Sequence, residues 1–370
     1  RNHFHYETED IYPTGLAPRS MRADAASRRT RHRVYAGDAR RLPLPDDSVE
    51  LVVTSPPYPM IEQWDDQFAS MDPAVATALD DGDGQAAFDR MHAVLRDAWA
   101  ELARVVVDGG VVCVNVGDAT RTVAGEFRLY PNHARVTRAL TDLGFRQLPG
   151  VLWRKPPNAP TKFMLPGTLP PNAYVTLEHE HALVFRNGDR RDFAPGADHP
   201  SEASYFFEER NRWFSDLWDD LRAAPQVTNE ETPRDRRAAF PVELPYRLVS
   251  MYSVYGDTVL DPFWGTGSTT LAAMATARDS VGVESVPELP AQFDDRVDAV
   301  RSWSRERARR RLSAHRETVA DREDTYEATH YDFDVVSRQE RDLRLYAVSE
   351  TERVLGGYRV AHEPATDTET

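Results

Sequence analysis

Lysine is nearly absent from this chain of 370 residues, and cysteine occurs once. Only Lys155 and Lys162 carry an ammonium group, so almost all of the positive charge is arginine, and the net charge is -15. The composition lacks the polybasic character of an obvious nucleic-acid-binding protein, so any such contact must come from a local basic surface. Many carboxylates with few lysines indicate a high-salt cytoplasm, and a GC-rich genome that favours arginine and aspartate codons is the alternative explanation.

The single cysteine, Cys113, lies in the apolar run 111–116, which predicts a small buried residue rather than a nucleophile. One cysteine permits no internal disulfide and fits a reducing compartment, so we expect a cytoplasmic protein. No apolar run approaches the ~20 residues of a membrane-spanning helix, and we see no signal peptide. A Gly-Lys-Ser or Gly-Lys-Thr triplet is also missing, which excludes a phosphate-binding P-loop.

The chain is organised around residues 47–58. Residues 51–53 (Leu-Val-Val) form a short apolar run, typical of a parallel strand buried on both faces. Ser-Pro-Pro-Tyr follows at 55–58, and its prolines end the strand because neither can donate to a ladder. Ser55 and Tyr58 are therefore expected on a stiff backbone at the edge where open α/β sheets bind ligands. A rigid hydroxyl, a carbonyl free of helix bonding and an aromatic face suit a planar ring that bears an amino group.

A second predicted strand ends at Leu260 and is followed by Asp-Pro-Phe-Trp-Gly-Thr-Gly at 261–267 and then by a helix. The two glycines allow a ligand to approach the backbone, and the start of the helix favours electronegative groups. A glycine loop alone serves NAD, another nucleotide or no ligand. Here the next strand ends in Glu284, and an acid in that place typically accepts hydrogen bonds from ribose hydroxyls.

Hydrophobic periodicity around these motifs predicts alternating strands and helices, which indicates a wound α/β fold. Strands are predicted at 32–35, 49–54, 111–116, 145–153, 177–185, 258–260 and 280–284, and helices at 88–102, 132–143, after the run 240–245 to about 255, from 268 and at 295–316. Residues 59–85 are expected to form a long irregular segment.

The order of the two motifs resembles that of S-adenosylmethionine-dependent DNA amino-methyltransferases of the circularly permuted β-type. In that family the catalytic tetrapeptide precedes the cofactor loop, as 54–58 precedes 261–267 here, and Phe-Pro-Val-Glu-Leu at 240–244 resembles the helix that supports the cofactor. The likeness covers about residues 32–290. It implies a Rossmann-like methyltransferase fold: α/β, with a mostly parallel seven-stranded sheet, helices on both faces and an irregular target-recognition insertion.

The resemblance also implies roles for single residues. Ser55 Oγ and the Pro56 carbonyl would accept hydrogen bonds from the target amino group, and Tyr58 would stack on the base. Glu284 would hold the ribose hydroxyls, and Asp38 the adenine amino group, unless Asp38 is only a turn residue. The complete sets are, for catalysis, Ser55, Pro56, Pro57 and Tyr58 and, for S-adenosylmethionine, Asp38, Thr54, Phe240, Pro241, Asp261, Pro262, Phe263, Gly265, Gly267, Ser268 and Glu284.

The tetrapeptide further implies N4 of cytosine as the target, because Asp-Pro-Pro-Tyr is commoner in the family for N6 of adenine, which is the alternative. The run 54–61 resembles archaeal N4-cytosine modification methylases that act on CTAG. Methylation at carbon-5 needs a cysteine nucleophile and is disfavoured by the place of Cys113. RNA or protein-glutamine methyltransferases usually have the reverse motif order, and a regulatory module without catalysis would not need an intact tetrapeptide.

Four regions follow from these motifs. Residues 1–31 form a basic N-terminal arm, 32–153 and 236–294 the catalytic and cofactor-binding core with 177–187 as a further core strand, 154–235 a target-recognition region, and 295–370 a charged helical extension. The arm is either a solvated tail or a phosphate contact, and the arginine-rich helix at 305–311 either clamps DNA or is solvated.

Double-stranded DNA is the expected partner, with a cognate restriction endonuclease unless the enzyme is solitary, and the chain is expected to be a monomer or homodimer. The candidate DNA-contacting residues are Arg154, Lys155, Lys162, Arg210 and Arg212. Trp213 and Trp218 are expected to pack in the core. Glu-His-Glu-His at 178–181 would alternate between the faces of a strand, so no metal site is expected.

Overall fold

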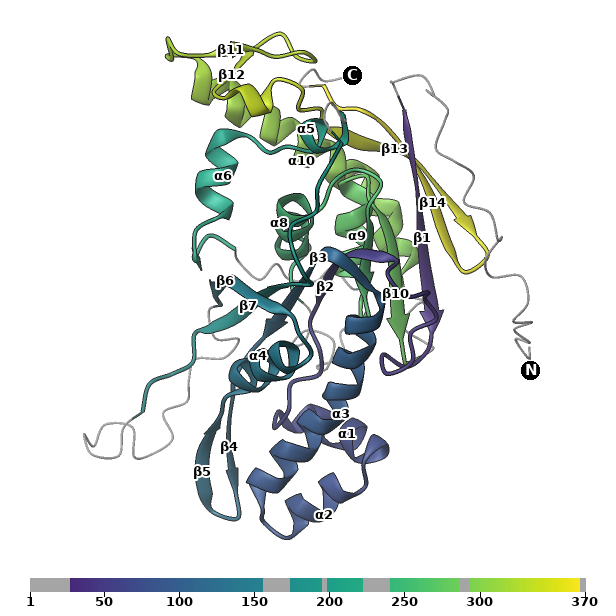
Figure 1. Cartoon of the computed structure of the whole chain (residues 1–370), viewed down its shortest axis with the longest axis vertical. Coiled ribbons are helices and arrows are strands. Elements are labelled where there is room, and N and C mark those ends of the chain that lie inside the picture. The colour runs from purple at the N-terminus through teal and green to yellow at the C-terminus, as the bar shows by residue number, and fades with distance from the viewer. Residues whose placement is uncertain (1–26, 156–173, 195–197, 222–239, 287–292, 367–370) are drawn as a thin grey trace.

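The structure is a computed structural model that describes residues 27–155, 174–194, 198–221, 240–286 and 293–366 (Figure 1). The expectations for Lys162, for residues 1–26 of the N-terminal arm and for much of the target-recognition region lie outside these residues. In the described part of the chain, no helix is both long enough and apolar enough to span a membrane.

One mixed sheet of ten strands forms the centre of the molecule. Its strands, in spatial order, are β13 (Tyr346–Val354), β14 (Gly357–Pro364), β1 (Arg28–Ala36), β10 (Asp279–Glu284), β9 (Thr258–Asp261), β2 (Val49–Thr54), β3 (Val106–Val116), β7 (His179–Arg186), β6 (Arg146–Arg154) and β8 (Leu217–Trp218). Strands β1, β10, β9, β2 and β3 are parallel neighbours, and β7 and β6 follow as an antiparallel pair. These seven strands are the predicted core, which β8, β13 and β14 widen at both edges.

The strand pairing explains how two distant motifs meet. Strand β1 lies beside β10 in parallel register, with Ala36 opposite Glu284, although the two strands lie far apart in the sequence. Strand β2 lies between β9 and β3, so Thr54 and Asp261 end neighbouring strands. The carboxyl ends of five parallel strands therefore share one edge of the sheet, as the predicted permuted fold requires.

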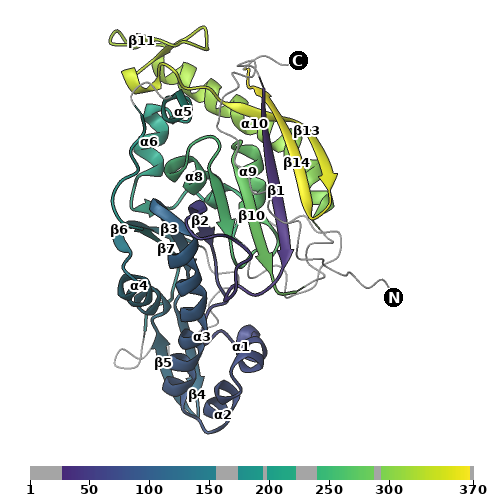
Figure 2. The same ribbon diagram turned by 45° about the vertical axis from the view of Figure 1, so that its right-hand side comes forward.

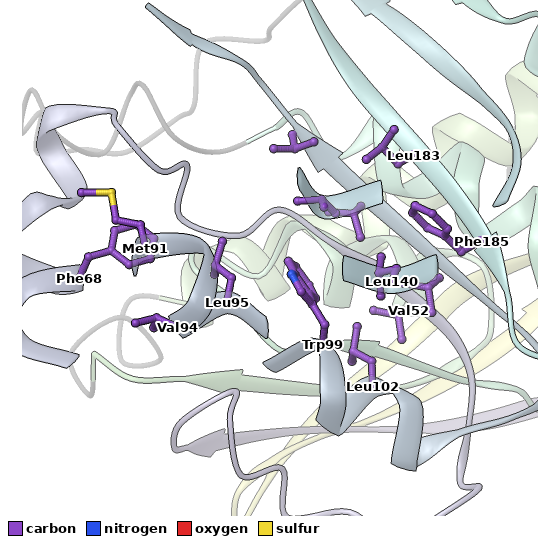
Figure 3. Packing of buried hydrophobic residues seen from close by; sticks show 14 of the residues in the cluster. Val52, Phe68, Met91, Val94, Leu95, Trp99, Leu102, Leu140, Leu183 and Phe185 are labelled. Carbon is purple, nitrogen blue, oxygen red and sulfur yellow. The ribbon is translucent and has the colours of Figure 1, made fainter. Parts of the chain in front are cut away.

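Helices cover both faces of the sheet (Figure 2). They are η1 (Glu62–Trp64), α1 (Asp65–Met71), α2 (Ala74–Asp80), α3 (Gly84–Val105), α4 (Asn132–Asp142), α5 (Asp198–Glu202), α6 (Phe207–Trp213), α8 (Glu243–Tyr252), α9 (Ser268–Ala275), α10 (Asp294–Val319) and η4 (Arg338–Glu340). On one face, Trp99 and Leu102 of α3 pack with Val52 and Phe185 of the sheet (Figure 3). On the other, α8, α9 and α10 enclose a second cluster that contains Leu51, Val53 and Cys113. Alternate residues of β2 thus enter the two cores, as expected for a strand buried on both sides.

The prediction of an irregular segment at 59–85 is wrong. This segment forms η1, α1 and α2, and α3 then begins at Gly84, where the Asp83 carboxylate accepts a hydrogen bond from the backbone of Ala86 at 2.9 Å. Two further differences follow downstream. Strand β3 begins at Val106 instead of 111, and β4 (Ala119–Val123) and β5 (Glu126–Tyr130) form an unpredicted hairpin.

The two ends of the chain also differ from the prediction. Strand β1 begins at Arg28, so three arginines of the expected arm belong to the sheet, where β1 pairs with β14. The described part of the extension is helical in α10 and briefly in η4, and otherwise it forms β11 (Tyr326–Glu327), β12 (Asp334–Val335), β13 and β14. Trp213 and Trp218 are both buried at 1% exposure, which confirms that they pack in the core.

Candidate active site

A cleft of about 1760 Å³ opens at the carboxyl edge of the parallel strands. Its wall contains all four residues of the predicted catalytic tetrapeptide, from the end of β2, and the predicted cofactor residues Asp261, Gly265 and Glu284. On the far side the wall is formed by α1, by Arg121 of β4 and by Phe127 of β5. The structure therefore brings the two predicted motifs into one cavity.

Two prolines set the geometry of the tetrapeptide. Pro56 and Pro57 are buried, whereas Ser55 and Tyr58 are partly exposed in the cleft, with Ser55 Oγ 3.0 Å from Tyr58 Oη. Thr54 lies behind them, where its hydroxyl donates to Asp261 Oδ1 at 2.7 Å. Thr54 is fully buried and thus ties the end of β2 to the predicted cofactor loop, although it does not line the cleft.

The cofactor loop is held by both backbone and side-chain contacts. Gly265 and Gly267 have φ angles of 55° and 77°, a region that favours glycine. The Glu284 carboxylate accepts hydrogen bonds from the backbone N–H groups of Gly265 and Val286, each at 2.8 Å. Asp261 is buried beneath the loop, and desolvation raises the pKa of its carboxyl to about 6. Such a carboxylate would be stabilised by a positively charged ligand.

The remaining predicted cofactor residues divide into two groups. Asp38, Phe240, Pro262, Phe263 and Ser268 line the cleft. Asp38 is held by Arg40, whose hydrogen bonds lower the pKa of the Asp38 carboxyl. Gly267 and Pro241 do not line the cleft: a methyl group on Gly267 would lie 2.4 Å from the Phe293 ring, and the Pro241 carbonyl accepts a bond from Leu244 at the start of α8.

Three residues that were not predicted as catalytic surround the tetrapeptide. Glu180, at the start of β7, is 9% exposed and accepts a hydrogen bond from Tyr58 Oη at 3.1 Å. Asn115 Nδ2 donates to Tyr58 Oη at 3.0 Å and to Glu180 Oε2 at 2.6 Å. Lys155 Nζ lies 2.7 Å from Glu180 Oε1. The sequence suggested Lys155 only as a DNA contact and Glu180 only as part of the run 178–181. The antiparallel pairing of β7 with β3 is what carries Glu180 to this edge.

The candidate DNA-contacting residues that the structure describes do not form one surface. Lys155 lies in the cleft, and Arg154 is exposed and 3.4 Å from Glu178. Arg210 and Arg212 lie on α6, which Figure 1 places at the opposite end of the molecule from α1 and α2. Arg210 lines a second cavity, of about 700 Å³, together with residues that precede β9. The arginines at 305, 307, 309, 310 and 311 each contact a carboxylate.

One cluster of possible metal ligands lies beside the cleft. Asp118, His133 and His181 have ligand atoms within 4.8 Å of one another. The Asp118 carboxylate accepts from the backbone N–H of His133 at 3.0 Å and contacts its Nδ1 at 2.7 Å, which fixes the start of α4. Desolvation lowers the pKa of His181 to about 4, so its imidazole is neutral at pH 7. These contacts hold Asp118 and His133 together at the start of α4.

Comparison with known proteins identifies the family. The profile of the DNA methylases of the N6 and N4 type matches residues 49–293. The chain belongs to this DNA methylase family. The match spans both the tetrapeptide and the cofactor loop, and it confirms the prediction of a DNA amino-methyltransferase.

Individual relatives of this DNA methylase agree with the assignment. The Type II methyltransferase M.MthZI of Methanothermobacter thermautotrophicus is 45% identical over 322 residues, which cover 86% of this chain and 91% of the relative. M.MjaI of Methanocaldococcus jannaschii, also a Type II methyltransferase, is 41% identical over 283 residues, which cover 72% and 91%.

A solved structure also supports the fold. TTHA0409 from Thermus thermophilus, crystallised in complex with S-adenosyl-L-methionine, has a TM-score of 0.55 and 31% identity, covering 73% of this chain and 94% of that one. The PvuII cytosine-N4-specific DNA methyltransferase has a TM-score of 0.51 at 18% identity, covering 71% and 85%, and shows the fold alone. The predicted methyltransferase fold is therefore confirmed.

Proposed function

We propose that this DNA methylase transfers the methyl group of S-adenosylmethionine to the exocyclic N4 of a cytosine that is flipped out of duplex DNA. The observation that carries the cytosine assignment is Ser55, a serine in place of an acid at the first position of the tetrapeptide. The N6 amine of adenine is the alternative target, since both bases present an amine of the same chemistry.

The residues of the cleft fit the cofactor. Gly265 has a left-handed backbone and no side chain. A methyl group on Gly265 would meet no other atom within 3.4 Å, so a ligand can approach this part of the cleft wall. The buried Asp261 lies beside this wall, and a sulfonium ligand would stabilise its charged form. Glu284, at the end of β10, and Asp38, just after β1, both line the cleft, which supports the proposal that they hold the ribose and the adenine. S-Adenosylmethionine supplies an activated methyl group when it is bound.

The tetrapeptide positions the base for this transfer. Ser55 Oγ and the Pro56 carbonyl accept hydrogen bonds from the target amine, and Tyr58 presents its ring to the base. Positioning and electrostatics account for the rate, because the amine attacks directly and needs no covalent intermediate with the protein. Extrusion of the base has an unstacking cost, which stacking against an aromatic ring offsets by roughly 1–3 kcal/mol.

The biological setting is part of the same proposal. Two relatives are Type II methyltransferases, which supports a role as the modification half of a restriction system with a cognate endonuclease. From the run 54–61 we infer CTAG as the recognition site to test first. From the acidic, lysine-poor composition we infer a high-salt archaeal cytoplasm as the setting.

Labelling of nucleosides tests the target. The protein is incubated with tritiated S-adenosylmethionine and duplex DNA with or without CTAG sites, and the DNA is hydrolysed to nucleosides. Label in N4-methylcytosine, dependent on CTAG, is expected. Label in N6-methyladenine would move the target to adenine, and label in carbon-5-methylcytosine would contradict amine chemistry.

Replacement of the serine tests the site itself. Ser55→Ala should slow methyl transfer by about 100-fold, because the hydroxyl that orients the amine is lost, and should leave cofactor affinity within about twofold. Ser48→Ala, which removes an exposed hydroxyl before β2, is the control and should leave both quantities unchanged. Loss of cofactor affinity with an unchanged rate would contradict the role given to Ser55.

A further inference from the structure

The contacts of Glu180 define the direction of a hydrogen-bond chain in the cleft. A carboxylate only accepts, so the Tyr58 hydroxyl donates its single proton to Glu180, at 3.1 Å, in preference to the more distant Asn115 carbonyl at 3.4 Å. Asn115 Nδ2 donates to both groups; the reverse orientation of this amide would place its oxygen against the carboxylate. Ser55 Oγ, 3.0 Å from Tyr58 Oη, must then donate its own proton to Tyr58.

This direction decides what Ser55 offers to a substrate. Once its proton is directed to Tyr58, Ser55 Oγ presents only lone pairs to the cleft, so it accepts from an amine and repels a carbonyl oxygen. Packing holds the side chains of this hydrogen-bond chain in place. Gly117 lies against both partners, and a methyl group there would be 3.2 Å from the Tyr58 ring and 3.3 Å from the Glu180 side chain.

The same chain offers a path for a proton. Transfer forms a carbon–nitrogen bond and breaks the carbon–sulfur bond of the donor, whose electron pair stays on sulfur. The amine is left with a positive charge and one proton too many. That proton passes to Ser55 as the Ser55 proton moves to Tyr58 and the Tyr58 proton to Glu180, which becomes neutral and returns the proton to water through the cleft that it lines.

We propose that Glu180 is a positioning residue for methyl transfer: through Tyr58 it holds the Ser55 hydroxyl as an acceptor for the target amine, and it receives the proton that the methylated amine releases. Lys155 Nζ holds the second carboxylate oxygen at 2.7 Å, so the Glu180 carboxylate is fixed between Tyr58 and Lys155. This inference rests on the proposed role of Ser55 at the amine.

The histidines near Glu180 do not contact its carboxylate. His179 and His181 neighbour it on β7, and their rings contact each other at 4.9 Å, so they share the opposite face of the strand. His133 stacks on His181 at 4.2 Å and contacts Asp118. Among the described residues, Tyr58 and Lys155 are thus the titratable groups that contact the Glu180 carboxylate.

Single-turnover methylation by the full chain tests the proposal. In Glu180→Gln the amide can donate to Tyr58, which reverses the direction of the hydrogen bonds. The rate of methyl transfer should therefore fall by about 100-fold or more, while the affinities for S-adenosylmethionine and DNA stay within about twofold. Glu178→Gln is the matched control: this exposed glutamate contacts Arg154, and its loss should leave the rate unchanged. A Glu180→Gln enzyme as fast as wild type would overturn the proposal.

A double variant distinguishes an effect transmitted through the hydrogen-bond chain from a change in the structure of the protein. Tyr58→Phe removes only the hydroxyl that joins Ser55 to Glu180, so Glu180→Gln should cost no more than about threefold further in the Tyr58→Phe background. Two independent losses that multiply would show that Glu180 acts by another route. Wild-type protein that labels no DNA amine would instead contradict the proposed function itself, whatever the variants do.

Discussion

At the scale of single residues, Asp261 shows how burial and binding are linked. Its carboxyl is fully buried, and desolvation raises its pKa to about 6 even though Thr54 donates a hydrogen bond that lowers it. An acid whose pKa is raised on folding stabilises the free protein below its unfolded value of 3.8, and this stability is lost as the pH rises through about 6. A cationic cofactor reverses the preference, because it favours the ionised form.

We therefore expect the affinity for S-adenosylmethionine to fall with acidification. Between about pH 7 and about pH 5, the dissociation constant should rise by up to about tenfold, because binding must then displace a proton from Asp261. Titration calorimetry over this range measures the change. Asp261→Asn should bind weakly and without this dependence, whereas Asp38→Asn should retain it, since Arg40 holds the pKa of Asp38 below its usual value. A flat profile for the wild type would disprove the link.

Single residues also mark what the sequence could and could not predict. Ser55, Asp261 and Glu284 were found because each follows directly on a recognisable apolar strand, and parallel strands end at one edge. Glu180 stands at the beginning of its strand. Only the antiparallel pairing of β7 with β3 brings that end of the strand to the cleft, and pairing direction is not encoded in a local pattern.

At the scale of elements, the cofactor loop depends on a close contact with β10. Gly282 lies under Trp264, whose indole N–H donates to Thr270 at 2.8 Å, and a methyl group at Gly282 would be 2.1 Å from the indole ring. Trp264 is 2% exposed, so it cannot shift without moving the residues that pack around it. The position of the loop therefore requires glycine at 282 for steric reasons alone.

Gly282→Ala should weaken cofactor binding by more than about tenfold, because the displaced tryptophan carries Gly265 with it. Equilibrium binding measures the affinity for S-adenosylmethionine, and thermal melting measures the stability of each variant. Gly125→Ala is the control: it lies in the β4–β5 turn with open space around it and a φ of 84°, so it should lower stability by about 1 kcal/mol without changing cofactor affinity. Equal affinities for Gly282→Ala and wild type would show that the loop adapts.

Other elements show why local patterns failed. The segment 59–85 contains helices of only seven residues, α1 and α2, with Phe68 and Val75 among their few buried side chains, too short for a helical period to emerge. The C-terminal strands were hidden for a different reason. Strand β14 alternates between buried residues such as Tyr358 and Val360 and exposed charged ones, and the sequence reads as a charged tail until β1 is known to lie beside it.

At the scale of the whole molecule, charge is the dominant feature. The chain carries 60 acidic and 45 basic residues, and the described cations that line the cleft, Arg40, Arg121 and Lys155, each contact a carboxylate. Repulsion among unpaired carboxylates opposes the compact state, whereas surface ion pairs contribute little individually. Added salt should therefore raise the stability of the folded protein, because screening of the repulsion stabilises it more than screening of the ion pairs destabilises it.

Thermal melting in KCl distinguishes the two explanations of this composition. Simple screening is nearly complete by about 0.5 M salt, where the Debye length is below the spacing of most surface charges. A protein adapted to a high-salt cytoplasm should continue to gain melting temperature up to about 2 M KCl and keep its methyl-transfer activity there, because its carboxylate surface stays hydrated. Such activity would have to rest on base contacts and stacking in the cleft, since counterion release offers little drive at that salt. A melting temperature that levels off near about 0.5 M, with activity lost above it, would assign the acidic composition to codon usage instead.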